Sequence, residues 1–308
     1  MIPNRLYGDI YVVKVLFTVP RWHYLVVIKR RSNIMNRQLI YVPLAITVIA
    51  CVSLVVHGPI AQLPNYHDFA DQSAWLGIAN AADVLSNIGF AVIGVCGYIV
   101  LRPMQTHPAL SRGWIGYRLF LAGLVLTALG SSFYHLAPDN ARLVWDRLPI
   151  VLACAGLLSA VRVETRQDTN VIRDTTLLAL FAIASVAWWW FTDQFGNGDL
   201  RPYLLLQILP LVLIPLWQAI YGFNRRDRVW FGIALLLYVL AKISELNDHQ
   251  IFAALGWISG HTGKHLLATA AAGMLVFRLW QRTSPQAKAD YEISDRLVPT
   301  EAAQAAPD

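Results

Sequence analysis

The sequence predicts an all-α polytopic membrane protein. Of its 308 residues, 56% are hydrophobic and 14% are charged, whereas a soluble domain carries about 25% charged residues. The hydrophobic residues also gather into runs of about 20, which is the length of a helix that crosses a bilayer. Composition and run length together therefore predict a bundle of transmembrane helices.

Eight apolar runs are long enough to be spans, and each is expected to form a helix. They lie at 39–57, 83–102, 114–136, 143–161, 174–192, 202–222, 229–246 and 262–280. Tryptophans stand near the ends of several runs, at Trp114, Trp188, Trp189, Trp190, Trp230 and Trp280. This placement is typical of the aromatic belts at the two membrane interfaces.

The chain on either side of these runs is polar or interrupted. Residues 10–28 are moderately apolar, but a lysine, a proline and an arginine make this stretch a poor span. We interpret residues 1–38 as a surface or disordered lead-in, with Met35 as an alternative start of the protein. Residues 281–308 combine Ala, Pro and charged residues, and we expect a disordered cytoplasmic tail.

The basic residues predict how the helices are oriented. They concentrate in every second loop, at Lys29, Arg30, Arg31, Arg37, Arg102, Arg112, Arg162, Arg166, Arg173, Arg225, Arg226, Arg228, Arg278 and Arg282. The opposite loops offer Arg142 and Arg201. Because Lys and Arg accumulate in cytoplasmic loops, both termini are expected in the cytoplasm. The same asymmetry accounts for the net charge of +6, so nucleic acid is not an expected partner.

Five polar residues in or beside these runs form a candidate site. His261 and His265 are one helical turn apart and share a face, as do Ser131 and His135. Asp146 begins the run that follows His135. With eight alternating spans, all five lie at similar depth on the non-cytoplasmic side. Ionisable residues at membrane depth are costly and therefore usually mark a functional site.

These side chains fit a catalytic site for Zn²⁺, with His135, His261 and His265 as ligands. Three protein ligands and an open fourth position are typical of catalytic zinc, which lowers the pKa of a bound water to about 7. Asp146 is predicted to orient that water and take its proton. Ser131 is predicted to donate a hydrogen bond to the developing oxyanion.

Simpler interpretations remain for each residue. A single intramembrane histidine often does no more than hydrogen-bond to a neighbouring helix. Asp146 is flanked by Arg142 and Arg147, which favours an interfacial salt bridge as the alternative. Ser131 is a small residue of the kind that serves helix packing. The agreement in depth favours the metal site for the three histidines taken together.

The outer loop at 58–82 holds a second candidate metal site. Asp68 and Asp71 are three residues apart, with amide and hydroxyl oxygens nearby. Such hard oxygen ligands suit Ca²⁺, although on spacing alone a solvated acidic loop is the alternative. Three residues near the end of the seventh run are predicted to shape the entrance or to support the ligands. These are Glu245, Asp248 and His249.

The combined motif Ser131-x3-His135, Asp146 and His261-x3-His265 resembles the signature of the alkaline ceramidase family. That family belongs to a membrane-hydrolase superfamily that also includes the progestin/adiponectin-type receptors. The surroundings at 130–140 and 83–87 resemble bacterial members.

The resemblance spans about residues 68–280 and seven of the eight runs. It implies a seven-helix transmembrane catalytic core at 83–280, with the run at 39–57 as one additional N-terminal transmembrane helix. It also implies zinc on the three histidines and hydrolysis of the amide bond of a ceramide-like membrane lipid. The resemblance to bacterial members implies a bacterial inner membrane.

The family's calcium loop reads Asp-Trp-x-Glu-x-Asn, followed by a Glu at the start of the next helix. Here the loop reads Asp68-Phe69-x-Asp71-x-Ser73, with Asn80 or Asp83 where that Glu would stand. These departures weaken the implied calcium site and the implied substrate. Neither the lipid head group nor the oligomeric state follows from the sequence.

Two other functions remain open from the sequence. One is a receptor-like protein that binds lipid and keeps zinc for structure. The other is a b-type haem protein, because transmembrane histidines can be axial ligands. Three histidines and an aspartate at one depth favour zinc over haem.

Overall fold

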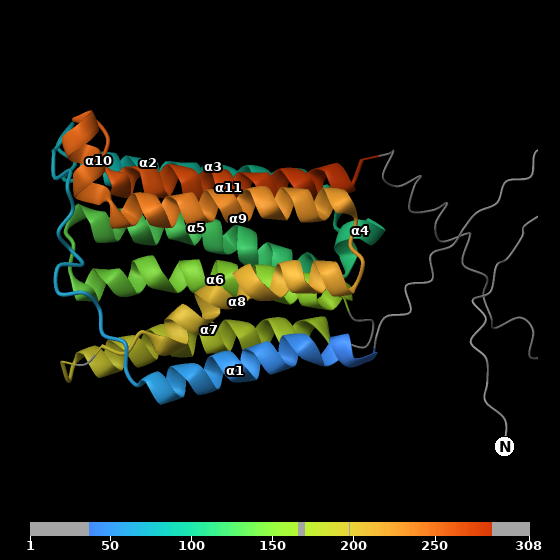
Figure 1. Ribbon diagram of the computed structural model, residues 1–308. Helices are drawn as coiled ribbons and strands as arrows, with labels where there is room; N and C mark the ends of the chain where they lie inside the picture. The colour runs from blue at the N-terminus through green and yellow to red at the C-terminus, as the bar shows by residue number, and fades with distance from the viewer. Residues whose placement is uncertain (1–36, 166–169, 197, 285–308) are drawn as a thin grey trace, which may run out of the picture.

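The computed structural model of the protein describes residues 37–165, 170–196 and 198–284. The lead-in at 1–36, the alternative start at Met35 and the tail from 285 lie outside the described residues. The described part is helical, and the long helices run side by side along one direction (Figure 1).

The helices have the following bounds. They are η1 (Arg37–Tyr41), α1 (Val42–His57), α2 (Ala81–Ser86), α3 (Ile88–Leu101), η2 (Arg102–Met104), α4 (Pro108–Ser111), α5 (Trp114–Leu136), α6 (Asn140–Thr165), α7 (Val171–Asp193), α8 (Arg201–Ile220), α9 (Arg225–Leu246), α10 (Asp248–Leu255) and α11 (Gly260–Arg282). Each of the eight predicted runs is helical over most of its length, although 39–57 and 83–102 are each divided between helices and 202–222 extends past the end of α8. The short helices α4 and α10 were not predicted.

Seven helices in the described part of the chain are long and apolar enough to cross a membrane, which makes this a multi-pass membrane protein by length and composition. The predicted eighth span, α11, is not one of the seven. It is 23 residues long, but it opens with the polar sequence Gly260–His265 and ends with two arginines. The polar residues of the candidate site, His261 and His265, thus reduce the apolar character of α11.

The run at 83–102 is divided in the structure. Asn87 separates α2 from α3, and its side-chain amide donates to the backbone oxygen of Asp83 at 2.9 Å. The backbone NH of Asn87 still bonds the oxygen of Val84 at 3.4 Å. This break leaves α2 as a short helix that carries Asp83 and Ser86 at one end of the bundle.

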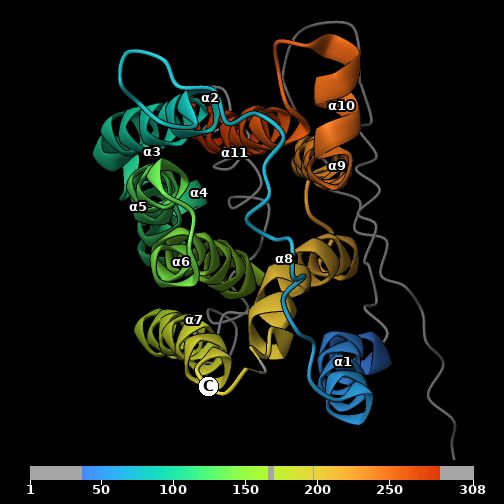
Figure 2. The same cartoon turned by 90° about the vertical axis from the view of Figure 1, so that its left-hand side faces the viewer.

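The helices differ in how far they are buried. In the most apolar window of α6, 56% of the residues are buried, against 6% for the window at Leu39–His57. Seen along the bundle, α6 lies between α5 and α7, whereas α1 lies at the edge beside α8 (Figure 2). α6 is therefore central, and α1 is peripheral.

The C-terminal end of α1 is hydrogen-bonded to the start of α8. The guanidinium of Arg201 donates to the backbone oxygen of Leu54 at 3.2 Å, and Asp199 accepts from the backbone NH of Ile60 at 3.3 Å. Burial raises the pKa of Asp199, but hydrogen bonds from Arg201 and from the Trp188 indole outweigh it and hold the pKa at about 2. The Asp199 carboxylate is therefore charged at neutral pH, and it accepts hydrogen bonds from Arg201 and from the backbone NH of Ile60.

The segment 58–80 crosses the end of the bundle from α1 to α2 (Figure 2). It is held by side chains that reach across it. Gln62 accepts from the Arg147 guanidinium at 2.7 Å, and His67 contacts the Tyr134 hydroxyl at 2.8 Å. We call residues 58–80 the outer segment. It covers the end at which the candidate site lies.

Helices α5 and α6 approach each other closely where they carry the site. Pro149 has no backbone NH, so it cannot form the usual helical bond to the carbonyl of Trp145 four residues earlier. Gly130 of α5 lies against that carbonyl, since a Cβ at position 130 would be 1.9 Å from the Trp145 oxygen. This contact sets the spacing between Ser131 on α5 and Asp146 on α6.

We expect Gly130→Ala to destabilise the protein by at least about 1–3 kcal/mol, because the added methyl would overlap backbone that cannot move aside. The measurement is thermal unfolding of the detergent-purified variant. The matched control is Gly232→Ala in α9, where an added Cβ meets nothing within 4 Å. Its melting temperature should stay the same or rise, because Ala favours a helix over Gly by about 1 kcal/mol. Equal melting temperatures for the two variants would contradict the tight contact.

Candidate metal centre

The three predicted histidine ligands converge. One nitrogen each of His135, His261 and His265 lies within 4.8 Å of the others, and all three residues are buried. The Nε2 atoms of His135 and His261 are 3.2 Å apart. Two nitrogens on a tetrahedral zinc, with Zn–N bonds of about 2.0–2.1 Å, would be separated by about 3.3 Å. His135 and His261 are therefore spaced as a metal ion would require, and His265 lies near enough to complete the group.

Helix ends fix the positions of these histidines. Ser259 caps α11 by accepting from the backbone NH of Thr262 at 3.0 Å. Asp248 accepts from the backbone NH of His261 at 2.7 Å, so two side-chain oxygens satisfy the free donors of this first turn. At the end of α5, the Asn80 side chain donates to the backbone oxygen of His135 at 2.7 Å. Both histidine-bearing turns are thus held by residues distant in sequence.

The partner of His265 determines its tautomer. The Ser86 hydroxyl donates to the backbone oxygen of Asp83 at 2.9 Å and lies 2.8 Å from Nδ1 of His265. Because the single hydroxyl hydrogen is already used, Nδ1 of His265 must carry the proton and donate to Ser86. The Nε2 lone pair of His265 is then available to a metal ion, as in many metal sites.

Asp83 is the buried carboxylate of the site. Its Oδ1 accepts from the Thr262 hydroxyl at 2.6 Å. Its Oδ2 faces Nδ1 of His135 at 4.0 Å, and neither of these two atoms has a hydrogen-bond partner among the described residues. Ligation of a metal by His135 Nε2 would place the proton on Nδ1, where it faces Asp83. The unsatisfied pair therefore fits a metal-bound His135.

Phe69 of the outer segment covers the histidines. Its ring centroid lies 4.8 Å from the ring of His135 and 4.4 Å from that of His261. The segment is held there by Asp248, which also accepts from the backbone NH of Ala70 at 2.9 Å. Asp248 therefore joins α11 to the outer segment, so the histidines are shielded at the end of the bundle.

Ser131 and Asp146 line one cavity of about 210 Å³ together with His265. Both residues are buried. No ion pair of the described residues includes Asp146; Arg142 pairs with Asp139 instead. Arg147 stacks on the Trp189 ring, with its guanidinium carbon 4.0 Å from the ring centroid. The salt-bridge alternative for Asp146 therefore has no contact to support it.

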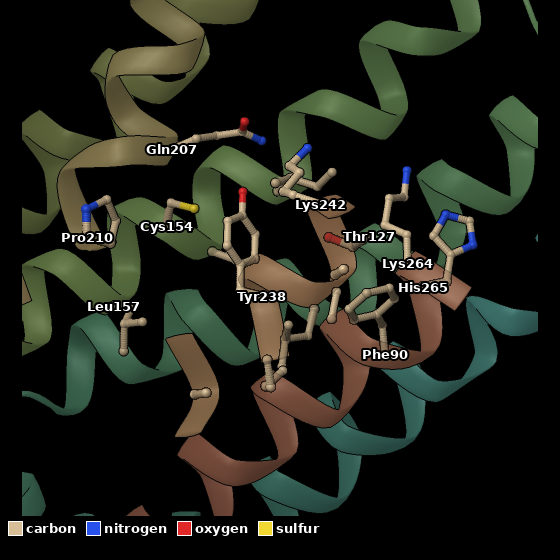
Figure 3. Close-up of a pocket in the computed structure, with 18 of the residues that line it drawn as sticks. Phe90, Thr127, Cys154, Leu157, Gln207, Pro210, Tyr238, Lys242, Lys264 and His265 are labelled. Atoms are coloured by element: carbon tan, nitrogen blue, oxygen red, sulfur yellow. The ribbon is translucent and has the colours of Figure 1, made fainter. Parts of the chain in front are cut away.

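Polar and apolar side chains both line the cavity, with Phe90 near His265 and Gln207 near Pro210 (Figure 3). Lys264 also lies beside His265. Further apolar side chains line it, including Phe120, Leu124, Leu157, Leu235 and Leu275. The cavity thus leads from the histidines into the apolar interior of the bundle.

A chain of charged side chains adjoins the histidines; the sequence analysis predicted a supporting role for its glutamate, Glu245, but not for its two lysines. Nζ of Lys264 lies 2.9 Å from Nε2 of His261 and 2.9 Å from Oε1 of Glu245. Lys242 pairs with Oε2 of the same glutamate at 2.8 Å. The signal for Lys264 was its position three residues after His261 on α11, which places both on one face.

The candidate calcium residues do not come together in the same way. Asp68 is half-exposed and pairs with His249 at 3.6 Å. Asp71 is buried, and its Oδ1 accepts from the backbone NH and the hydroxyl of Ser73. Within the described residues, the group of three or more ligating side chains close enough for a metal ion consists of the three histidines. A calcium site at Asp68 and Asp71 stays a prediction.

Comparisons with protein-family models and with curated proteins gave no match to this chain. The fold and the geometry of the site therefore carry the functional argument.

Proposed function

We propose that this protein is a zinc-dependent membrane hydrolase that cleaves the amide bond of a ceramide-like or other N-acyl lipid. The observation that carries the proposal is the convergence of three buried histidines beside a buried Asp146 in an apolar-walled cavity. The histidine set is a nitrogen-donor set that suits zinc. The amide-lipid substrate rests on the resemblance to the alkaline ceramidases.

In this proposal His135, His261 and His265 hold the metal. When bound, zinc supplies an acidified water and polarises a carbonyl. Ser86 and Asp83 keep the imidazoles in the ligating tautomer, because each lies opposite an Nδ1 atom. Phe69 limits access of bulk water to the histidines from the end of the bundle.

Asp146 acts as the general base of the proposed reaction. It takes a proton from the attacking water and returns it to the leaving amine. Ser131 lines the same cavity, and its proposed role is to orient this carboxylate. The predicted role of Ser131 as an oxyanion donor stays a prediction.

The substrate enters sideways from the bilayer in this proposal. The outer segment lies across the end of the bundle, while the cavity is lined by side chains of α3, α5, α6, α8, α9 and α11. An acyl chain suits the apolar side chains of the cavity, which leaves the polar bond beside the histidines. A lipid dissolved in the membrane is therefore the substrate class that fits best.

The membrane placement is also a proposal. We propose that α11 is an eighth span, since it packs along α9 and α3, and that α1 stands outside a seven-helix core. The basic loops support an orientation with both termini in the cytoplasm and the metal site toward the other side, and the resemblance to bacterial family members supports a bacterial inner membrane.

A haem site fits this arrangement poorly. A haem with two histidine ligands must lie between their imidazole rings. Here the ring centroid of His135 lies 4.8 Å from that of His261 and 5.0 Å from that of His265. These T-shaped contacts leave no room for a macrocycle, so the geometry favours a single metal ion.

The test is lipid hydrolysis by purified protein with and without zinc. We expect release of a fatty acid from an N-acyl sphingoid lipid, loss of release after chelation, and recovery when zinc is added. Product is measured by mass spectrometry, and an ester analogue tests the requirement for an amide. Zinc and lipid binding without metal-dependent product would instead indicate the receptor-like alternative.

A further inference from the structure

The Lys264 ammonium lies at the histidine cluster, where it contacts a nitrogen that would otherwise bind a metal ion. Its Nζ lies 2.9 Å from Nε2 of His261, which is the nitrogen that also lies 3.2 Å from His135. An ammonium group can only donate hydrogen bonds, so His261 Nε2 must accept this bond. The lone pair that would bind a metal is therefore already engaged by Lys264.

Lys264 is built into the site. It is part of the cavity wall, and its ammonium also pairs with Glu245, at 2.9 Å. The side chain of Lys264 is 18% exposed and that of Glu245 19%, so both are largely removed from solvent. A buried lysine stays charged when it is paired with a carboxylate. The positive charge beside His261 is thus maintained by the fold.

Resting on the proposed function, we propose that Lys264 is a further catalytic residue with two roles. In the metal-free protein it holds the His261 lone pair and weakens metal binding. With the site loaded, His261 releases the ammonium, and Lys264 donates to the carbonyl oxygen of the substrate as that oxygen gains negative charge. The carbonyl oxygen then has a charged donor beside it, of the kind that stabilises an oxyanion.

Lys264 is better placed for this role than Ser131. Ser131 has a single hydroxyl donor, whereas Lys264 has three donors and uses two of them, on His261 and Glu245. Once His261 is released, a donor becomes free at the cluster itself. Glu245 keeps the side chain in position, because Lys242 holds its second oxygen at 2.8 Å.

The structure offers a matched control in Lys242. It carries the same charge, lines the same cavity and pairs with the same glutamate. Its ammonium donates to Glu245, and among the described residues it makes no hydrogen bond to a histidine. Replacing either lysine by methionine removes one charge and leaves Glu245 with one cationic partner. The two variants therefore differ in the contact with His261.

The experiment measures zinc affinity and lipid turnover of full-length wild type, Lys264→Met and Lys242→Met. Zinc affinity is obtained by competition with a coloured chelator, which needs no substrate. We expect Lys264→Met to bind zinc roughly 10- to 100-fold more tightly, because a hydrogen bond from a charged donor no longer competes. Its turnover should fall by roughly 10²–10³, as when an oxyanion donor is removed. Lys242→Met keeps the contact between Lys264 and His261, so its zinc affinity should stay close to that of wild type.

The outcomes separate this inference from the proposed function. Zinc binding with equal affinity in all three proteins, together with equal turnover, would overturn the role of Lys264 and leave the hydrolase standing. The same tightening in Lys242→Met would also overturn it, since a general charge effect would then be sufficient. Failure of all three to bind zinc while folded would overturn both. Tight binding confined to Lys264→Met supports the inference, even before a substrate is identified.

Discussion

His265→Ala is expected to abolish metal retention and lipid hydrolysis together, while the protein remains folded. The substitution removes one of three ligands, and two histidines do not complete a zinc site. It also frees Ser86, which can hydrogen-bond to water in the space left by the imidazole. Elemental analysis of detergent-purified protein should give about one zinc per chain in wild type and close to none in the variant.

His249→Ala is the control for the loss of a histidine. His249 lies at the same end of the bundle, but its side chain is 57% exposed and pairs with Asp68. Its zinc content and turnover should equal those of wild type, and circular dichroism should show helical protein in both variants. Hydrolysis that survives in His265→Ala would contradict the three-histidine site. No zinc in folded wild type purified without chelator would contradict the zinc mechanism itself.

Asp146→Asn is expected to keep zinc and lose turnover by roughly 10²–10⁴, the range for a general base. The amide has the size of the carboxylate, so the fold should persist. It cannot accept the proton of the attacking water at neutral pH. Zinc content and product formation are measured on the same preparation.

Asp139→Asn serves as the control for Asp146→Asn. Asp139 caps α6 by accepting from the backbone NH of Arg142 at 2.7 Å, and asparagine is an equally good cap. This variant should keep both zinc and turnover. Unchanged turnover in Asp146→Asn would remove the general base from the mechanism. Failure of Asp146→Asn to insert or fold would return that residue to a structural role.

The helical bundle was predictable because each span carries its own signal. A run of about 20 apolar residues forms a helix in a membrane whatever surrounds it, since every backbone group must be satisfied within the segment. The run at 114–136 coincides with α5, and the run at 39–57 lies within η1 and α1. α11 has the weakest hydropathy signal of the long helices and is not among the seven candidate spans. Its first turns carry the polar residues of the candidate site, and these residues lower its hydropathy.

The pairing of His261 with His265 was also local, because residues four apart share a helix face. The alternation of spans predicted that all three histidines lie at one end of the bundle. It did not predict that they meet. In the structure, Asp248 holds the first turn of α11 and Asn80 holds the last turn of α5, where the histidines lie.

The surroundings of the histidines had no local signal in the sequence. Asp83 and Ser86 come from a short helix created by the break at Asn87, and they meet α11 across 179 positions of sequence. In the sequence, Lys264 stands between His261 and His265, and no pattern there indicates its role. That role depends on Glu245 of α9, which accepts a hydrogen bond from the Lys264 ammonium. Periodicity describes one helix at a time, so it finds the residues that share a face. Hydrogen bonds between helices depend on which helix faces are in contact and on how the helices are shifted along the bundle axis. The packing of the whole bundle determines both the contacting faces and this shift.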